Sequence, residues 1–82
     1  MSIQTYVNRL SRLDQLIRLR CTGTPQELAD KLGLSKRMVY EYLNAMRDLG
    51  APIAYSNIEK SYFYVGLGQF FIGYKIKNAS AV

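Results

Sequence analysis

The sequence predicts an α+β fold in which three helices precede a C-terminal antiparallel sheet of two or three strands. Up to Gly50, apolar residues recur at spacings of three and four, as in helices with one buried face. After Gly50 they alternate with polar residues, which is the period of a strand. With 82 residues, 49% of them hydrophobic, we expect a single domain over about residues 1–77 and a frayed tail at 78–82.

The first helix is expected over about residues 3–20. Asp14 lies at the margin of its apolar stripe, whereas Leu16 and Leu19 lie off it, either partly exposed or covered by the tail or a second subunit. A lone cysteine can form neither an internal disulfide nor a zinc cluster, so Cys21 is interpreted as a small buried hydrophobe. The core-facing stripe is predicted to contain Ile3, Tyr6, Val7, Leu10, Leu13, Ile17 and Cys21.

The second helix, over about residues 25–32, has clear start and stop signals. Thr24 and Glu27 have the spacing of a capping box, and the proline between them suits the first helical position. Gly33 can adopt the left-handed conformation that ends a helix. The predicted apolar face is Leu28, Ala29 and Leu32.

The third helix is expected over about residues 36–49, between an N-cap at Ser35 and a closing Gly50. Only Gly33 and Leu34 separate the second and third helices, and so tight a corner is typical of a helix-turn-helix. The core face of the third helix is predicted to contain Val39, Tyr42, Leu43, Met46 and Leu49.

The sheet is expected over about residues 52–76. Strands near 52–55 and 62–65 flank a polar connection at 56–61, in which Asn57 is suited to a positive φ. A third strand is expected within 69–77. The alternation of Tyr55, Tyr62 and Tyr64 favours packing in the sheet over base stacking. Together the elements predict a three-helix winged helix-turn-helix whose wing has two or three strands.

The formal net charge of +5 and the isoelectric point near 9.6 favour a polyanionic partner such as duplex DNA. The charge is uneven, at +3 for residues 1–23, 0 for 24–50 and +2 for 51–82. We therefore expect weak binding by a monomer, which a homodimer on a two-fold site would strengthen. The favourable field is expected from Arg9, Arg12, Arg18, Arg20, Lys60, Lys75 and Lys77.

The third helix has a polar, cationic face opposite its apolar face, made of Lys36, Arg37, Tyr40, Asn44 and Arg47. In a major groove, arginine can fork to guanine, asparagine can bond adenine, and tyrosine can contact phosphate or a thymine methyl. The helix N-terminus at Ser35 can hold a phosphate. Glu41 would repel phosphate unless it accepts from a cytosine amino group or pairs with Arg37 or Arg18. In the wing, Asn57, Lys60 and Ser61 are candidates for phosphate or minor-groove contact.

Residues 24–64, TPQELADKLGLSKRMVYEYLNAMRDLGAPIAYSNIEKSYFY, resemble the winged helix-turn-helix domains of small bacterial transcriptional regulators of the DeoR-like and related type. The resemblance implies that the helix holding Ser35, Lys36, Arg37, Met38 and Tyr40 contacts operator DNA. Met38 and Glu41 stand where that family often has threonine and a basic residue, and no ligand-sensing domain follows. The predicted DNA-binding residues are Ser35, Lys36, Arg37, Met38, Tyr40, Glu41, Asn44, Arg47, Asn57 and Lys60.

Two other function classes compete with DNA binding. The neutral helix-turn-helix suggests a protein-interaction module that uses the third helix or an edge strand at 69–77. An enzyme, for example one with a DNA-cleaving tyrosine, is disfavoured because the chain has no histidine to act as a base. No metal, cofactor or small-molecule ligand is expected. No apolar run could span a membrane and no signal peptide is apparent, so a bacterial, cytoplasmic protein is expected.

Overall fold

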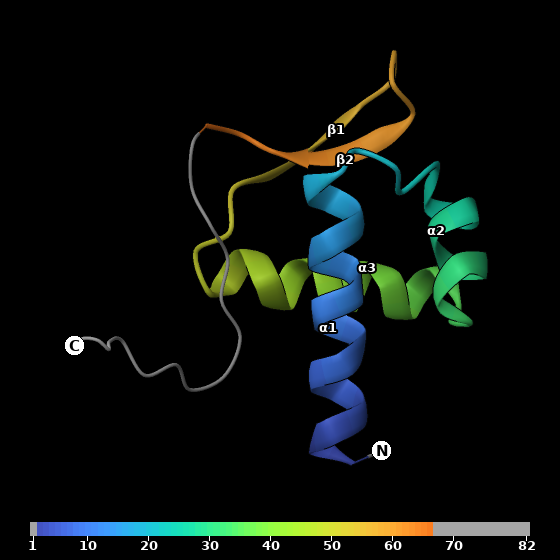
Figure 1. Cartoon of the computed structure of the whole chain (residues 1–82), viewed down its shortest axis with the longest axis vertical. Coiled ribbons are helices and arrows are strands. Elements are labelled where there is room, and N and C mark those ends of the chain that lie inside the picture. The colour runs from blue at the N-terminus through green and yellow to red at the C-terminus, as the bar shows by residue number, and fades with distance from the viewer. Residues whose placement is uncertain (1, 67–82) are drawn as a thin grey trace.

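A computed structural model describes residues 2–66 and contains three helices followed by a two-stranded antiparallel sheet (Figure 1). The elements are α1 (Ile3–Arg18), α2 (Pro25–Leu32), α3 (Lys36–Asp48), β1 (Ile53–Ser56) and β2 (Ser61–Tyr64). This is the predicted winged-helix α+β arrangement. The third strand expected at 69–77 and the tail expected at 78–82 lie outside the described residues.

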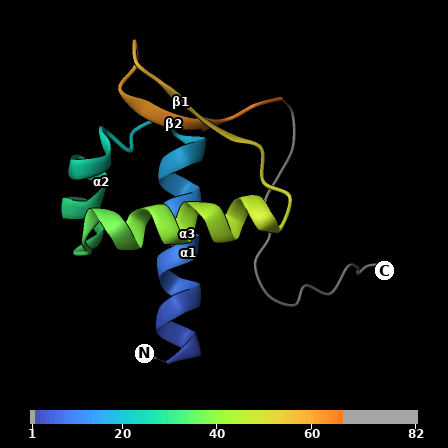
Figure 2. The ribbon, with the colours of Figure 1, turned by 180° about the vertical axis from the view of Figure 1, so that it is seen from behind.

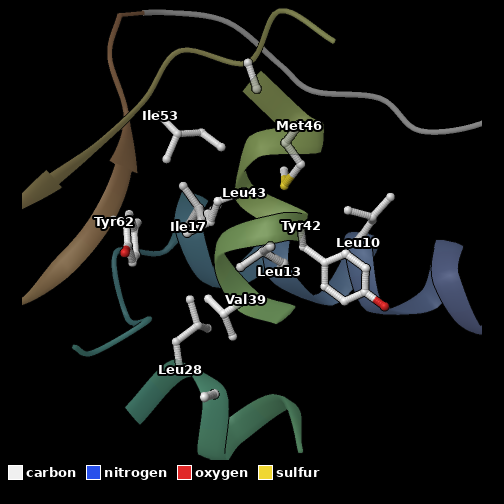
Figure 3. Close-up of a cluster of buried hydrophobic side chains, with 12 residues drawn as sticks. Leu10, Leu13, Ile17, Leu28, Val39, Tyr42, Leu43, Met46, Ile53 and Tyr62 are labelled. Carbon is white, nitrogen blue, oxygen red and sulfur yellow. The ribbon is translucent and has the colours of Figure 1, made fainter. Parts of the chain in front are cut away.

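The helices and the sheet share one core. α1 crosses α3, α2 lies beside the N-terminal end of α3, and the sheet lies across the C-terminal end of α1 (Figures 1 and 2). Side chains from every element meet between them (Figure 3). The buried hydrophobic residues are Leu10, Leu13, Ile17, Leu28, Ala29, Val39, Tyr42, Leu43, Met46, Ala51, Ile53 and Tyr62. The exposed faces of α3 and of the hairpin are therefore held in a fixed relation to each other.

α1 is shorter at its C-terminal end than predicted, and two of the core assignments at its ends were wrong. It ends at Arg18, and Arg20 then turns the chain in the left-handed region at φ 53°. Cys21 consequently leaves the helical stripe and is exposed, so the prediction that it is buried was wrong. Ile3, in the first turn, is also exposed. The sequence did not decide whether Leu16 and Leu19 are covered. Leu16 packs against the core and Leu19 is exposed.

Asp14, predicted at the margin of the α1 stripe, is buried. Its carboxylate accepts a 2.7 Å hydrogen bond from the Tyr64 hydroxyl and pairs with Arg18 at 3.2 Å. Burial, followed by this hydrogen bond to Asp14, raises the pKa of Tyr64 above its ordinary value. The contact joins the middle of α1 to the end of β2.

The predicted capping box of α2 is confirmed. Thr24 Oγ1 accepts from the Glu27 backbone N–H at 3.2 Å, and Glu27 Oε1 accepts from the Thr24 backbone N–H at 2.8 Å. The Thr24 backbone N–H, and then its side chain, lower the pKa of Glu27 because they stabilise the carboxylate. Gly33 ends the helix at φ 68°, as predicted, and the Leu34 N–H donates to the carbonyl of Ala29.

α3 begins at its predicted N-cap but ends one residue early, at Asp48. Leu49 is its C-cap and is 65% exposed, so the prediction that Leu49 is buried was wrong. Gly50 follows with φ 101° and turns the chain toward β1. Because the helix has already ended, Leu49 no longer follows the helical stripe that buries Met46.

The hairpin differs from the prediction in the length of its turn. Ser56 pairs with Ser61, so the turn contains four residues, 57–60, in place of a six-residue connection. The positive φ falls on Lys60, at 56°, and Asn57 does not share it. Tyr62 is buried and contacts Tyr55 edge to face at 4.9 Å between ring centroids, which confirms that these tyrosines pack in the sheet.

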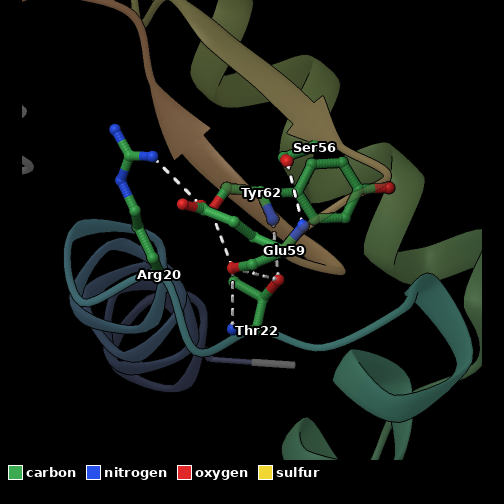
Figure 4. Close-up of polar contacts among 6 residues, drawn as sticks. Arg20, Thr22, Ser56, Glu59 and Tyr62 are labelled. Carbon is green, nitrogen blue, oxygen red and sulfur yellow. Dashed lines mark hydrogen bonds and ion pairs between the residues drawn. The ribbon is translucent and has the colours of Figure 1, made fainter.

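The hairpin is fastened to the chain that leaves α1 (Figure 4). Thr22 Oγ1 accepts from the Tyr62 N–H at 2.9 Å, and Ser61 Oγ accepts from the Thr22 N–H at 3.1 Å. Arg20 pairs with Glu59 at 3.0 Å, and its guanidinium lies 4.7 Å from the centre of the Phe63 ring. Because the Thr22 and Ser61 side chains are fully or almost fully buried, these bonds are shielded from water and fix the sheet on α1.

Candidate nucleic-acid interface

The N-terminal end of α3 is electropositive. Ser35 has an extended backbone, and its hydroxyl accepts from the Met38 N–H at 3.2 Å. The first turn contains no acidic residue, and Lys36 and Arg37 within it are both exposed. The positive end of the helix dipole therefore adds to the charge of two accessible cations.

The outward face of α3 carries the polar residues that the sequence places there. Arg37 has a side chain that is 88% exposed and pairs with Glu41 at 3.4 Å. Of the two partners suggested for Glu41, the structure shows Arg37, since Arg18 pairs with Asp14. An exposed pair of this kind contributes at most about 1 kcal/mol, so Arg37 can exchange Glu41 for another anion at little cost.

Other predicted residues on α3 differ in their access to solvent. Asn44 is exposed, and Tyr40 is 44% exposed. Met38 is half-buried and packs against the core, so only part of its side chain is available to a ligand. Lys36, Arg37, Tyr40, Glu41 and Asn44 thus form the accessible surface, which we call the α3 face.

The α3 face continues onto the sheet. Arg47 Nε donates to the Ile53 carbonyl at 3.3 Å, and Arg47 Nη1 donates to Asn44 Oδ1 at 3.4 Å. Burial, and next the nearby Tyr40, raise the pKa of the Tyr62 phenol. The Arg47–Ile53 bond places the C-terminal half of α3 against β1.

The tip of the hairpin presents only some of the residues predicted for it. Asn57 and Lys60 are exposed, as a contact role requires. Ser61 is 1% exposed and its hydroxyl is bonded to Thr22, so the suggestion that Ser61 contacts DNA was wrong. Ile58, which was not among the residues predicted for the tip, is 94% exposed. The available signal was a single apolar residue inside a polar connection.

The arginines of α1 and of the turn after it mostly have partners within the protein. Arg9 Nη1 donates to the Tyr42 hydroxyl at 3.2 Å, Arg18 pairs with Asp14, and Arg20 pairs with Glu59. Arg12 is exposed. Near the α3 face and the hairpin tip, the exposed positive charges within the described part of the chain are those of Lys36, Arg37, Arg47 and Lys60. Lys75 and Lys77 lie outside the described residues.

The chain matches one known protein family. A family model described as an HTH domain matches residues 3–57, which extend from α1 into the hairpin turn and make up more than half of the chain. The chain belongs to the HTH domain family. In such domains the second helix of the pair, here α3, is the one that reads DNA in the major groove. No curated protein and no solved structure matches the chain.

Within residues 2–66, no group of His, Cys, Asp and Glu side chains is arranged to hold a metal ion. None of the helices in that range is long and apolar enough to cross a membrane.

Proposed function

We propose that this HTH domain is a sequence-specific duplex-DNA-binding protein that regulates transcription in the bacterial cytoplasm. The N-terminal half of α3 enters the major groove, and the hairpin contacts the flanking DNA backbone. The observation that supports this most is the capped N-terminus of α3, whose first turn lacks acidic side chains and exposes Lys36 and Arg37.

Each residue of the α3 face has a role in this proposal. Arg37 forks to a guanine and Asn44 bonds an adenine, while Tyr40 contacts a phosphate or a thymine methyl. Ser35 and Lys36 hold backbone phosphates at the helix N-terminus. Glu41 releases Arg37 on binding and accepts from a cytosine amino group, which removes the repulsion between this carboxylate and the DNA.

The remaining predicted residues act at the edges of the contact. Met38 supports the α3 face from the core side and offers its exposed part to the groove. Arg47 directs its charge toward the DNA backbone while it remains bonded to the Ile53 carbonyl. Asn57 and Lys60 contact phosphates beside the groove that α3 occupies.

The charge distribution also bears on the assembly that binds DNA. A monomer with so few accessible cations is expected to bind non-specific duplex with a Kd of about 10⁻⁴ to 10⁻⁶ M at physiological salt. A homodimer on a two-fold site, with half-sites about 34 Å apart, would roughly double the contacts. Sedimentation with and without DNA measures whether two copies bind together.

The decisive experiment is selection of bound sequences from a random duplex pool, followed by fluorescence anisotropy of the winner at several salt concentrations. We expect a preferred sequence and an affinity that falls steeply as salt rises. Lys36→Ala should weaken binding and reduce the slope of log K against log salt concentration by about 1. Arg37→Ala should weaken binding by about 1–3 kcal/mol and relax the preference at one base pair.

Arg12→Ala is the matched control, because it removes one positive charge from the exposed surface of α1. α1 lies in front of α3 in Figure 1 and behind it in Figure 2, so the two helices are on opposite sides of the domain. This variant should bind nearly as well as the parent. If no sequence is enriched, or if Arg12→Ala weakens binding as much as Lys36→Ala does, α3 is not the reading element. A tight protein partner without retention of DNA would favour the interaction-module alternative.

A further inference from the structure

The most exposed large apolar side chain within residues 2–66 lies at the hairpin tip. Ile58 is 94% exposed and stands in the four-residue turn between β1 and β2. A single exposed isoleucine is common on protein surfaces and by itself indicates nothing. The turn that carries Ile58 is, however, held by several specific contacts.

The backbone of the turn is fixed from both sides. Ser56 Oγ accepts from the Glu59 N–H at 3.1 Å, and this bond spans Asn57 and Ile58. Lys60 closes the turn at φ 56°, a left-handed conformation that costs a residue other than glycine about 1–2 kcal/mol. Such a conformation persists only where the surrounding structure determines it. The tip therefore holds Ile58 in a defined place.

The charge beside Ile58 is also arranged. Glu59 would repel a polyanion, but Arg20 pairs with it at 3.0 Å and draws it toward α1 (Figure 4). Arg20 in turn lies over Phe63 of β2. Arg20 offsets the charge of Glu59, whose side chain stays 46% exposed, and Lys60 adds a positive charge at the tip. The tip thus combines an exposed apolar side chain with a cation, next to a carboxylate that is paired with Arg20.

The tip lies on the same side of the molecule as the N-terminal half of α3, as both views of the ribbon show (Figures 1 and 2). The Arg47 bond to the Ile53 carbonyl and the shared core fix this relation. A duplex that takes α3 in its major groove presents a minor groove to one side. That groove is about 6 Å wide, which admits a single aliphatic side chain.

We propose that Ile58 enters the minor groove that flanks the α3 contact and packs against its sugar and base edges. This inference rests on the proposed DNA binding and adds an apolar wing contact to it. Aliphatic side chains are used in this way by proteins that bind the minor groove. Lys60 holds the adjacent phosphate, and the Arg20–Glu59 pair positions the tip.

The first test separates an apolar contact from a charged one through salt dependence. Ile58→Ala should lower affinity for the selected duplex about tenfold, consistent with partial burial of the three carbons that alanine lacks. Its salt slope should be unchanged, because an apolar contact releases no counterions. Lys60→Asn keeps a residue that tolerates the left-handed backbone and should reduce the slope by about 0.9.

The second test identifies the groove by chemistry. Duplexes carry A·T, G·C or inosine·C pairs in the flank, since inosine lacks the minor-groove amino group of guanine but matches its major-groove edge. The parent should bind the A·T and inosine·C flanks alike and the G·C flank more weakly. In Ile58→Ala this difference should shrink. Thermal unfolding of Ile58→Ala should match the parent, because the side chain packs on little.

The outcomes distinguish this inference from the function on which it rests. Unchanged affinity of Ile58→Ala, or a flank preference that treats inosine·C like G·C, overturns the wing contact. If Lys36→Ala still weakens binding in that case, DNA reading by α3 stands alone. If neither variant changes the affinity, both proposals are wrong.

Discussion

The helix-turn-helix corner and the hairpin are held by contacts of very different range. At the corner, Thr24 bonds Glu27 and Ser35 bonds Met38, each across three positions. In the hairpin, Ser61 bonds Thr22 across 39 positions and Tyr64 bonds Asp14 across 50. The corner can therefore be specified by short sequence signals, whereas the placement of the hairpin depends on residues far away in the chain.

This difference divides the proposed interface into two separately supported parts. The corner sets the start and direction of α3, and the segment after α1 sets the position of the hairpin tip. Gly23 lies between the two, directly after Thr22 and directly before the cap of α2. Substitutions on either side of this point should damage one part more than the other.

The largest effect is expected for Gly23→Ala, on the corner side. Gly23 has φ 75°, and an added Cβ would lie 2.7 Å from Glu27 Oε1 and 2.8 Å from Glu27 Cβ. The left-handed backbone alone costs about 1–2 kcal/mol, and displacement of the Glu27 side chain adds to it. Chemical unfolding should show a loss of at least about 2 kcal/mol.

Gly33→Ala is the matched control for Gly23→Ala. Gly33 is also left-handed, at φ 68°, but an added Cβ would have no neighbour within 4 Å. This variant should lose only the backbone contribution of about 1–2 kcal/mol. Equal losses in the two variants would mean that the contact with the Glu27 cap adds nothing at the corner.

Thr22→Val should produce the next largest effect and should act on the hairpin. It removes the acceptor of the buried Tyr62 N–H and a partner of the Ser61 hydroxyl. Buried polar groups left without a partner cost about 1–3 kcal/mol each, so we expect a loss of about 2 kcal/mol. Hydrogen exchange should show that the Tyr62 amide loses more protection than amides in α2.

Thr22→Ser retains the hydroxyl and controls for the change in side-chain size. It should keep the Tyr62 amide protected. If Thr22→Val instead reduces protection uniformly through α2 and α3, the hairpin and the corner unfold as one unit, and the separation drawn between them is incorrect.

The range of the contacts also explains which features were predictable from sequence. The starts of α2 and α3, the left-handed Gly33 and the polar face of α3 follow from signals within one or two helical turns. The exposure of Cys21 does not, because the chain turns away from α1 at a non-glycine residue, Arg20, in the left-handed region. The burial of Ser61 depends on Thr22, a partner that local alternation cannot reveal.

The residues of the candidate site also divide into those that local signals predict and those that they do not. Lys36, Arg37 and Asn44 were located from helical spacing alone, and the structure exposes all three. Ile58 lies in the connection predicted at 56–61, but an apolar residue there could equally have packed against the sheet, and only the structure shows it 94% exposed. Which of these side chains contact DNA stays a prediction that binding measurements must decide.

Tyr64→Phe should have the smallest effect, because Asp14 loses the Tyr64 hydroxyl but keeps Arg18. A loss of about 1 kcal/mol near neutral pH is expected. The pKa of Tyr64 is raised in the folded state, so its contribution is complete below the ordinary tyrosine pKa of 10.0 and declines as pH rises through the folded value. The free energy of unfolding measured above pH 10 should therefore show the difference between parent and variant becoming smaller.

Tyr55→Phe is the control, because the Tyr55 hydroxyl has no hydrogen bond within the described residues. The stability of this variant should decline at alkaline pH as fully as that of the parent. A difference between the parent and Tyr64→Phe that widens with pH would mean that the Tyr64 hydroxyl does not attach β2 to α1 as a neutral donor.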